Sequence, residues 1–414
     1  MDNSTSGYFI RFILGAAIAV VAGCQQPPPV CTTDCEGSEV EPNNTFAIAT
    51  AATINNNTAR IIGSVGQRGD IDVFDLGPMN VGDVVRVRIN SLGGSLQPAF
   101  ALYNRVNELI DEDTLTSIIS RSALPGLDHV VRADSDPFYL ALSHNVAGFT
   151  SGQYELDITV ERSGATPEPA TQTLYLNFSG GEIDDPVFGQ FEVGAFDAGD
   201  IDPLYAGQTE FMIQAIRETV EQNYARFDVT ILDSINDGPL PAEGASEILF
   251  GGFNDLAFGA AQDVDLYNQN QTDKAIIFTE SFEVDLFIQP PSPAGMSVAI
   301  ANVAAHEAGH LMGLHHVRDA DALMDEASPT FTLLADQEFM SAPLSTSIFP
   351  LGNHNSAALL DVIVGENPNP QPKRMHVTMQ LPTMLPDKTR SKCLNCVQRE
   401  ALVDALNNPA TDKK

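Results

Sequence analysis

A group of histidines between residues 306 and 316 has the residue types and spacing of a metal site. His306 and His310 are four residues apart, so on a helix they share one face and can both reach a zinc ion at about 2.0–2.1 Å. Glu307, beside the first histidine, can take a proton from a metal-bound water. Gly313 permits a sharp exit from the helix, which brings His316 back as a third ligand. The stretch therefore predicts a three-histidine zinc site whose fourth position is left to water.

The full pattern H-E-x-x-H-x-x-G-x-x-H is far more specific than its first half, because the glycine and the third histidine must also fall at fixed offsets. It resembles the zinc signature of the metzincin metallopeptidases, and Met324 lies where that family has a methionine turn beneath the metal. Val317 and Glu326 differ from the residues of the well-known subfamilies, so the subfamily is open, with the matrixin type nearest. His315 is interpreted as a bystander, although a shift of the third ligand by one residue also fits the sequence.

The resemblance implies a zinc endopeptidase that acts on a protein or peptide substrate. In it His306, His310 and His316 would hold the zinc and Glu307 would be the general base. An extended substrate would lie antiparallel to the edge strand of the sheet, here Ala260–Val264. Two alternatives stay open: a zinc hydrolase with a non-peptide substrate, and a non-catalytic binding protein of the cell surface.

The elements that must position these residues can be read from the periodicity of the apolar residues. A helix over about Ser297–Leu314 would carry the first two ligands. Around it we expect strands at Thr173–Phe178, Asp228–Leu232, Glu247–Phe250, Ala260–Val264 and Ala275–Thr279, and helices at Gln208–Ala225, Ala335–Met340 and Ser356–Val364. This order predicts an α/β (α+β) catalytic domain of the metzincin type over residues 173–366.

Residues 39–162 have the texture of a β-sandwich, which makes the chain multidomain. Short apolar runs are separated by Gly, Asn, Asp and Pro, as at Ala59–Val65, Val84–Ile89, Phe138–Leu142 and Tyr154–Val160. The motifs Glu41-Pro42-Asn43-Asn44 and Gly69–Phe74 resemble the bacterial pre-peptidase C-terminal (PPC) domain. For Asp70 and Asp72 turn capping is favoured, and calcium binding remains the alternative. A proline-containing linker, residues 163–172, joins the two domains.

Residues 1–23 predict a lipoprotein signal peptide. Phe12–Gly23 is an apolar run too short to span a bilayer. It ends in Val21-Ala22-Gly23-Cys24, which resembles the lipobox, where the cysteine is acylated and becomes the new N-terminus. Residues 24–38 would then be a tether, and a plain secretory signal is the alternative. We expect an exported protein anchored by lipid in the bacterial cell envelope, at the outer membrane or the cell surface.

The charge balance excludes one class of partner. Asp and Glu number 55 against 21 Lys and Arg, a formal charge of −34, and such a surface repels nucleic acid. The C-terminal tail, residues 367–414, is instead basic. We expect it to be loosely ordered and pinned by a disulfide, with attraction to the acidic body or to anionic envelope polymers as the alternatives.

Four further cysteines, Cys31, Cys35, Cys393 and Cys396, lie near the two ends of the chain. In an oxidising envelope disulfides are expected, although their pairing is open and a four-cysteine zinc site is an alternative. None of the four lies in a sequence like the inhibitory cysteine motif of matrixin propeptides.

Overall fold

The computed structural model describes residues 36–114, 124–145, 148–185, 189–326, 330–370 and 391–393 of the 414-residue chain. The predicted signal peptide and its Cys24 lie outside the described residues, as do Cys31, Cys35 and Cys396. Within these ranges no helix is both long and apolar enough to cross a membrane.

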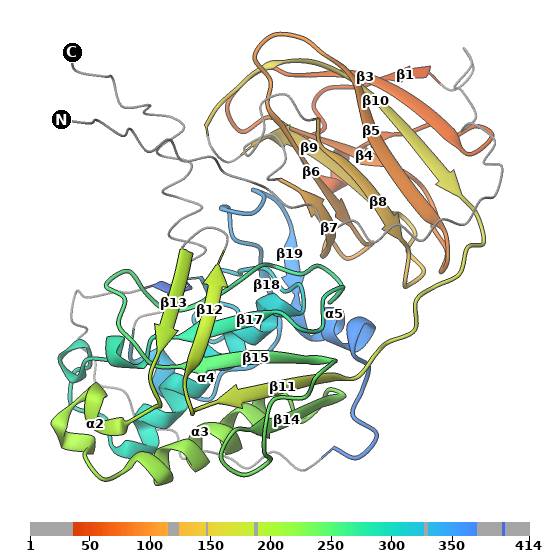
Figure 1. Ribbon diagram of the computed structural model, residues 1–414. Coiled ribbons are helices and arrows are strands. Elements are labelled where there is room, and N and C mark those ends of the chain that lie inside the picture. The colour runs from red at the N-terminus through yellow and green to blue at the C-terminus, as the bar shows by residue number, and fades with distance from the viewer. Residues whose placement is uncertain are drawn as a thin grey trace, which may run out of the picture. The chain divides into compact units, whose positions relative to one another are not determined.

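The N-terminal part forms two five-stranded sheets, with the orders β1-β3-β10-β5-β8 and β2-β4-β9-β6-β7 (Figure 1). Side chains from both sheets meet in one buried cluster, in which Val87 and Leu156 of the first sheet join Phe74 and Phe100 of the second. This confirms the predicted β-sandwich. The strands are β1 Glu36–Ser38, β2 Thr50–Ala51, β3 Thr58–Val65, β4 Ile71–Asp75, β5 Val84–Leu92, β6 Pro98–Tyr103, β7 Leu109–Asp113, β8 Gly126–Val130, β9 Tyr139–His144 and β10 Gly152–Glu161.

The second part is built on a six-stranded sheet of the order β14-β11-β15-β17-β16-β20. The first four strands in this order are parallel, whereas β16 runs antiparallel to β17. The strands are β11 Gln172–Asn177, β14 Val229–Asp233, β15 Ala245–Phe250, β16 Ala257–Ala261, β17 Lys274–Ile277 and β20 Ser391–Cys393. The α-helices are α2 Ala198–Ile201, α3 Thr209–Asn223, α4 Pro293–Leu311 and α5 Ser356–Ile363.

The two faces of this sheet are covered differently. Leu174 and Leu176 of β11 belong to the cluster that contains the buried sides of α3 and α4. Leu249 of β15 packs instead with residues of the hairpin formed by β12 (Gly181–Asp185) and β13 (Gly189–Val193). The layered α/β arrangement agrees with the prediction, and the hairpin was not predicted.

Two sequence expectations for this part are wrong. Residues 335–340 are not helical, and only a short 3-10 turn forms, at Thr332–Leu334. Tertiary hydrogen bonds take the backbone of this segment: the Asn302 amide donates to the Ala335 carbonyl at 2.9 Å, and Leu323 N–H donates to the Glu338 carbonyl at 2.8 Å. The strand expected at Ala260–Val264 begins three residues earlier, as β16 Ala257–Ala261.

A segment that follows the zinc signature contacts the sandwich. Between β18 (Ser341–Pro343) and β19 (Asn353–Asn355), Leu344, Ile348 and Phe349 join a buried cluster with outward-facing residues of β4, β6 and β9. The Tyr103 hydroxyl donates to the Leu351 carbonyl at 2.8 Å. Apolar packing and hydrogen bonding thus hold the segment 341–355 against the sandwich.

Candidate metal centre

The helix that carries the first two histidines, α4, is buried along nearly its whole length. Ser292 caps it through a bond from Gly295 N–H to its hydroxyl at 3.1 Å, and Pro293 stands in the first turn, where a missing N–H costs nothing. The apolar sequence up to Leu311 therefore forms a central helix, four residues longer at its start than the sequence predicted.

The helix ends in a Schellman motif built on Gly313. Gly313 N–H donates to the His310 carbonyl at 2.8 Å, and Leu314 N–H donates to the Gly309 carbonyl at 2.9 Å. Gly313 has φ +84°, the left-handed conformation that glycine adopts without a Cβ penalty. This turn returns the chain past the end of α4 and so positions His316.

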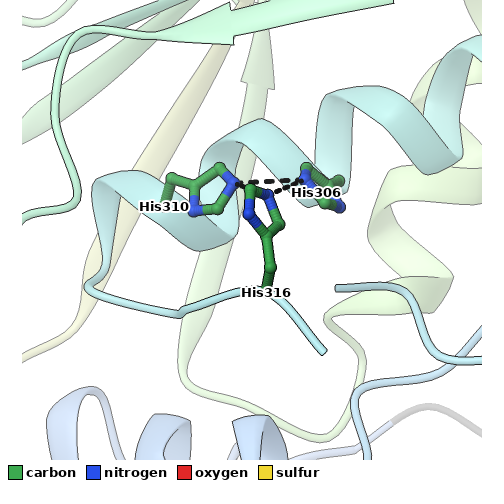
Figure 2. A group of neighbouring side chains, drawn as sticks. All are labelled: His306, His310 and His316. Carbon is green, nitrogen blue, oxygen red and sulfur yellow. Dashed lines mark hydrogen bonds between the residues drawn. The ribbon is translucent and has the colours of Figure 1, made fainter. Parts of the chain in front are cut away.

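Three imidazoles converge at this point, two from α4 and one from the loop after it (Figure 2). The distances between their Nε2 atoms are 3.1 Å for His306 and His310, 3.2 Å for His306 and His316, and 2.9 Å for His310 and His316. Two nitrogens bound to one zinc in tetrahedral geometry would be about 3.3 Å apart. All three side chains are at least 95 % buried. The spacing therefore fits a common metal ion.

The tautomers of two ligands support the same conclusion. His306 Nδ1 lies 2.8 Å from the Leu323 carbonyl, and His310 Nδ1 lies 2.7 Å from the Leu314 carbonyl. A carbonyl only accepts, so in each ring Nδ1 carries the proton and the Nε2 of the neutral imidazole presents a lone pair. Two lone pairs 3.1 Å apart repel unless a cation lies between them. These carbonyls orient the ligands in the way known from metal sites, and the sequence pattern did not reveal them.

Met324 packs against α4 at Gly309, which lies between His306 and His310 in the sequence. It is fully buried, and a Cβ added to Gly309 of α4 would lie 2.8 Å from its sulfur. The Met324 carbonyl accepts from Val317 N–H at 2.9 Å, which ties the turn to the residue after the third ligand. The preceding residue, Leu323, supplies the carbonyl that orients His306. Met324 therefore contacts the turn of α4 that carries both helical histidines, through Gly309.

The Glu307 side chain extends from α4 toward β16 of the sheet. Its side chain is fully buried, and a Cβ built on Gly259 of β16 would meet its Cγ at 2.7 Å and its Oε1 at 2.8 Å. Any side chain at position 259 would therefore displace the carboxylate. The sequence did not single out Gly259, because a lone glycine in a short apolar strand carries no signal of its own.

His315 does not join the three converging rings. Its ring packs against His354 of β19, and its Nε2 lies 3.9 Å from a Glu112 carboxylate oxygen of the sandwich. Its backbone N–H donates to His354 Nε2 at 3.2 Å. β19 is itself held by Glu108, whose carboxylate accepts from the Asn355 amide at 2.8 Å. The loop that carries the third histidine is thereby supported by residues of the sandwich.

A second cluster of ionisable groups lies in the sandwich. Oxygens of Glu41, Asp70 and Asp72 lie within 4.8 Å of one another. Burial raises the pKa of Asp72 to about 9. A hydrogen bond from Tyr154 acts in the opposite direction, and the neighbouring carboxylates raise the pKa further. Asp70 also caps a turn, accepting from Gly66 N–H at 2.6 Å. Glu41 was not identified as a potential ligand from the sequence.

Two buried oxygen atoms at this cluster accept no hydrogen bond from the described residues. Among the described residues, neither Asn43 Oδ1 nor Asp72 Oδ1 has a hydrogen-bond partner, and both side chains are fully buried. Buried polar atoms are nearly always paired, and carboxylate and amide oxygens are ligands that calcium accepts.

Comparison with solved structures gives low-identity likenesses for both parts of the chain. An archaemetzincin from Methanopyrus kandleri is 14 % identical, with 42 % of this chain and 91 % of that chain covered and a TM-score of 0.24. The pre-peptidase C-terminal domain of a collagenase from Bacillus anthracis is 13 % identical, with coverages of 27 % and 94 % and a TM-score of 0.18. A periplasmic inhibitor of g-type lysozyme from Aeromonas hydrophila is 12 % identical, with coverages of 30 % and 99 % and a TM-score of 0.22.

No sequence among the curated proteins matches this chain. A family model does: residues 236–340, about a quarter of the chain, match the matrixin peptidases. The matched residues include β15 to β17, the zinc helix, the three histidines and Met324. This match supports a zinc metallopeptidase and agrees with the resemblance seen in the sequence. The similarity to the matrixin peptidases thus extends over residues 236–340 and includes all three histidines of the candidate metal centre.

Proposed function

We propose that the chain is a zinc-dependent metalloendopeptidase that hydrolyses peptide bonds of extracellular or envelope proteins. The observation that carries the proposal is the convergence of three buried Nε2 atoms, two of them held in the metal-binding tautomer by backbone carbonyls. Bound zinc would polarise the scissile carbonyl and lower the pKa of a water molecule toward neutrality.

The residues of the chain supply the rest of the chemistry. Glu307 accepts the proton of the attacking water and delivers it to the leaving amine. Its burial between α4 and Gly259 fixes the carboxylate and keeps bulk water from competing for the proton. Met324 holds the turn of α4 between the two helical ligands by packing.

Two substitutions separate metal binding from proton transfer. In protein that begins after Cys24, His310→Ala should lose zinc, because it removes a ligand. Glu307→Gln should keep zinc, because it removes only the base, and should lower turnover of a quenched peptide by about 10²–10⁴-fold. Zinc content is measured by elemental analysis, and circular dichroism checks that each variant folds. Equal turnover by Glu307→Gln and the parent protein would refute the mechanism.

The same preparation distinguishes the alternatives. An endopeptidase cleaves casein or members of a peptide library, and a chelator abolishes the cleavage. Zinc binding without any peptide cleavage would favour a hydrolase of other substrates. A binding lipoprotein would show neither cleavage nor dependence on Glu307.

We also propose that the cluster of Glu41, Asp70 and Asp72 binds calcium. It is supported by three convergent carboxylates together with the unpaired oxygens of Asn43 and Asp72. A cation there would favour the ionised form of Asp72, whose pKa burial otherwise raises. Calcium should therefore raise the thermal midpoint of the sandwich, and Asp72→Asn should remove most of that increase. An unchanged midpoint at millimolar calcium would contradict the proposal.

The cellular location is proposed from the sequence alone. The lipobox at Cys24 supports export and acylation, so the enzyme would act while tethered to the bacterial envelope, at the outer membrane or the cell surface. Its partners there would be protein substrates and the lipid bilayer, and the formal charge of −34 disfavours nucleic acid.

A further inference from the structure

The third histidine comes from the loop after α4, so the segments beside that loop must hold it in place (Figure 2). The next residue, Val317, forms a parallel bridge with Asp325 and an antiparallel bridge with Leu344. Within the second bridge, Ser345 N–H donates to the His316 carbonyl at 3.0 Å. The third ligand therefore lies in the middle one of three paired segments.

The register of these bridges determines which side chains share a face with the ligand. Opposite residues of paired strands point to the same face, and successive residues along a strand alternate between the faces. Val317 and its two partners lie on one face. The residues next to them, which lie on the other face, include His316, Met324, Glu326 and Ser345. Both outer segments thus place a polar side chain on the face of the third ligand.

A hydrogen bond joins these two polar side chains. The Ser345 hydroxyl donates to a carboxylate oxygen of Glu326. The same hydroxyl accepts from Ser347 N–H at 3.1 Å, and the Ser345 side chain is fully buried. A hydrogen bond to an ionised carboxylate is stronger than one between neutral groups. The bond therefore links the two outer segments on the face that carries His316.

Ser345 is also attached to the sandwich. Its carbonyl accepts from Ile348 N–H at 3.0 Å and from Phe349 N–H at 3.2 Å. The side chains of both donors are buried among outward-facing residues of the sandwich. The backbone of Ser345 thus has a fixed position from which its N–H and its hydroxyl can hold the segment of the third ligand.

We propose that Ser345 and Glu326 are positioning residues that hold His316 in the geometry that zinc binding requires. The proposal rests on the proposed zinc site. The two helical ligands are fixed by α4, whereas the third depends on the segments paired with its own. A functional site must hold its groups to within about 0.5 Å of the productive geometry. Glu326, at which the sequence differs from the well-known subfamilies, thus has a function of its own in this chain.

The first test measures zinc affinity by competition with a chelator, in protein that begins after Cys24. Ser345→Ala and Glu326→Ala should each bind zinc about 10–100-fold more weakly than the parent. Glu326→Gln should stay within about threefold, because an amide oxygen still accepts the Ser345 hydroxyl. Ser281→Ala is the matched control: Ser281 is a fully buried serine of the same domain, whose hydroxyl accepts from Asn254 N–H and donates to the Asn254 carbonyl, both at 2.8 Å. That variant should bind zinc within about twofold of the parent.

The double variant Ser345→Ala/Glu326→Ala tests whether the two residues act through one bond. Its loss of zinc affinity should be smaller than the product of the two single losses, since residues in contact are not additive. A loss equal to that product would overturn the proposal, as would parent-like affinity in both single variants or equal weakening in Ser281→Ala. Circular dichroism checks folding. If Ser345→Ala does not fold, Glu326→Ala against Glu326→Gln still decides, because Glu326 is only partly buried.

The second test separates positioning from substrate binding. With a quenched peptide at saturating zinc, Ser345→Ala should lower kcat by about tenfold and leave KM within about twofold of the parent. A raised KM with unchanged kcat would assign Ser345 to substrate binding and so overturn the proposal. Failure of the proposed function gives a different result. The variants would then still differ in zinc affinity and in the visible spectrum of their cobalt(II) forms, although none would cleave peptide.

Discussion

Gly313 offers the sharpest test of how the third ligand is positioned. It has φ +84°, and a Cβ at this residue would lie 2.7 Å from Leu266 Cα, 2.8 Å from the Asp265 carbonyl oxygen and 2.9 Å from Tyr267 N. All three atoms belong to backbone, so no side-chain rotation can relieve the clash. The loop is itself fixed, because the Tyr267 hydroxyl donates to the Ile110 carbonyl of the sandwich at 2.6 Å.

The cost of Gly313→Ala follows from two contributions. A left-handed conformation costs an L-residue about 1–2 kcal/mol. Insertion of a methyl group into a packed site costs about 1–3 kcal/mol more. The expected loss of stability is therefore about 2–5 kcal/mol. Gly207→Ala is a matched control, because Gly207 has φ +79° with nothing within 4 Å of its added Cβ. That variant should lose only the conformational part, about 1–2 kcal/mol.

Urea unfolding of both variants, in protein freed of metal, separates the two contributions. The chain contains no tryptophan, so far-ultraviolet circular dichroism is the appropriate signal. Zinc affinity is then measured by competition with a chelator. Gly313→Ala should bind zinc at least tenfold more weakly than the parent, whereas Gly207→Ala should bind it equally well. Equal stability losses for the two variants, with unchanged zinc affinity, would refute the steric account of this turn.

Met324→Leu keeps the volume of the side chain that packs on Gly309, so this variant should retain zinc and lose less than about 1.5 kcal/mol of stability. Met324→Lys buries a cation and should expel the ion or unfold the site. Full zinc content and an unchanged melting point in Met324→Lys would place this residue on the surface. Burial raises the pKa of the Asp273 carboxyl from 3.8 to about 7, so the protonated form stabilises the fold below about pH 4 and this stabilisation is lost as the pH rises through 7. In urea unfolding across this pH range, Asp273→Asn should not show that loss of stability. The same pH profile for the variant and the parent would contradict this account. Glu108→Ala removes the acceptor of the Asn355 amide and so loosens β19, which contacts the loop that carries His316. The variant should therefore bind zinc more weakly in competition with a chelator. An unchanged zinc affinity would show that the sandwich does not support the metal centre. Cys24→Ser should abolish lipid labelling of expressed protein, and cleavage at the same bond as in the parent would indicate an ordinary secretory signal.

The order of the main elements could be predicted because it depends on local periodicity. The alternation of Tyr154, Leu156 and Ile158 predicts β10, and the apolar spacing of 208–225 predicts α3. Local periodicity could not show that residues 335–340 are not a helix. These residues favour a helix locally, but hydrogen bonds from Asn302 and Leu323 hold the segment in another conformation. Contacts between residues far apart in the sequence decided the outcome there.

The sequence by itself determined which three histidines converge, because their relative positions depend only on the geometry of one helix and one turn within eleven residues. Only the tertiary structure decided what surrounds them. The room that Gly259 leaves for Glu307 and the pairing of residues 391–393 with β16 depend on strand register across the sheet. No local spacing encodes such a register, since it is set by how distant segments satisfy their backbone hydrogen bonds and bury their apolar faces together.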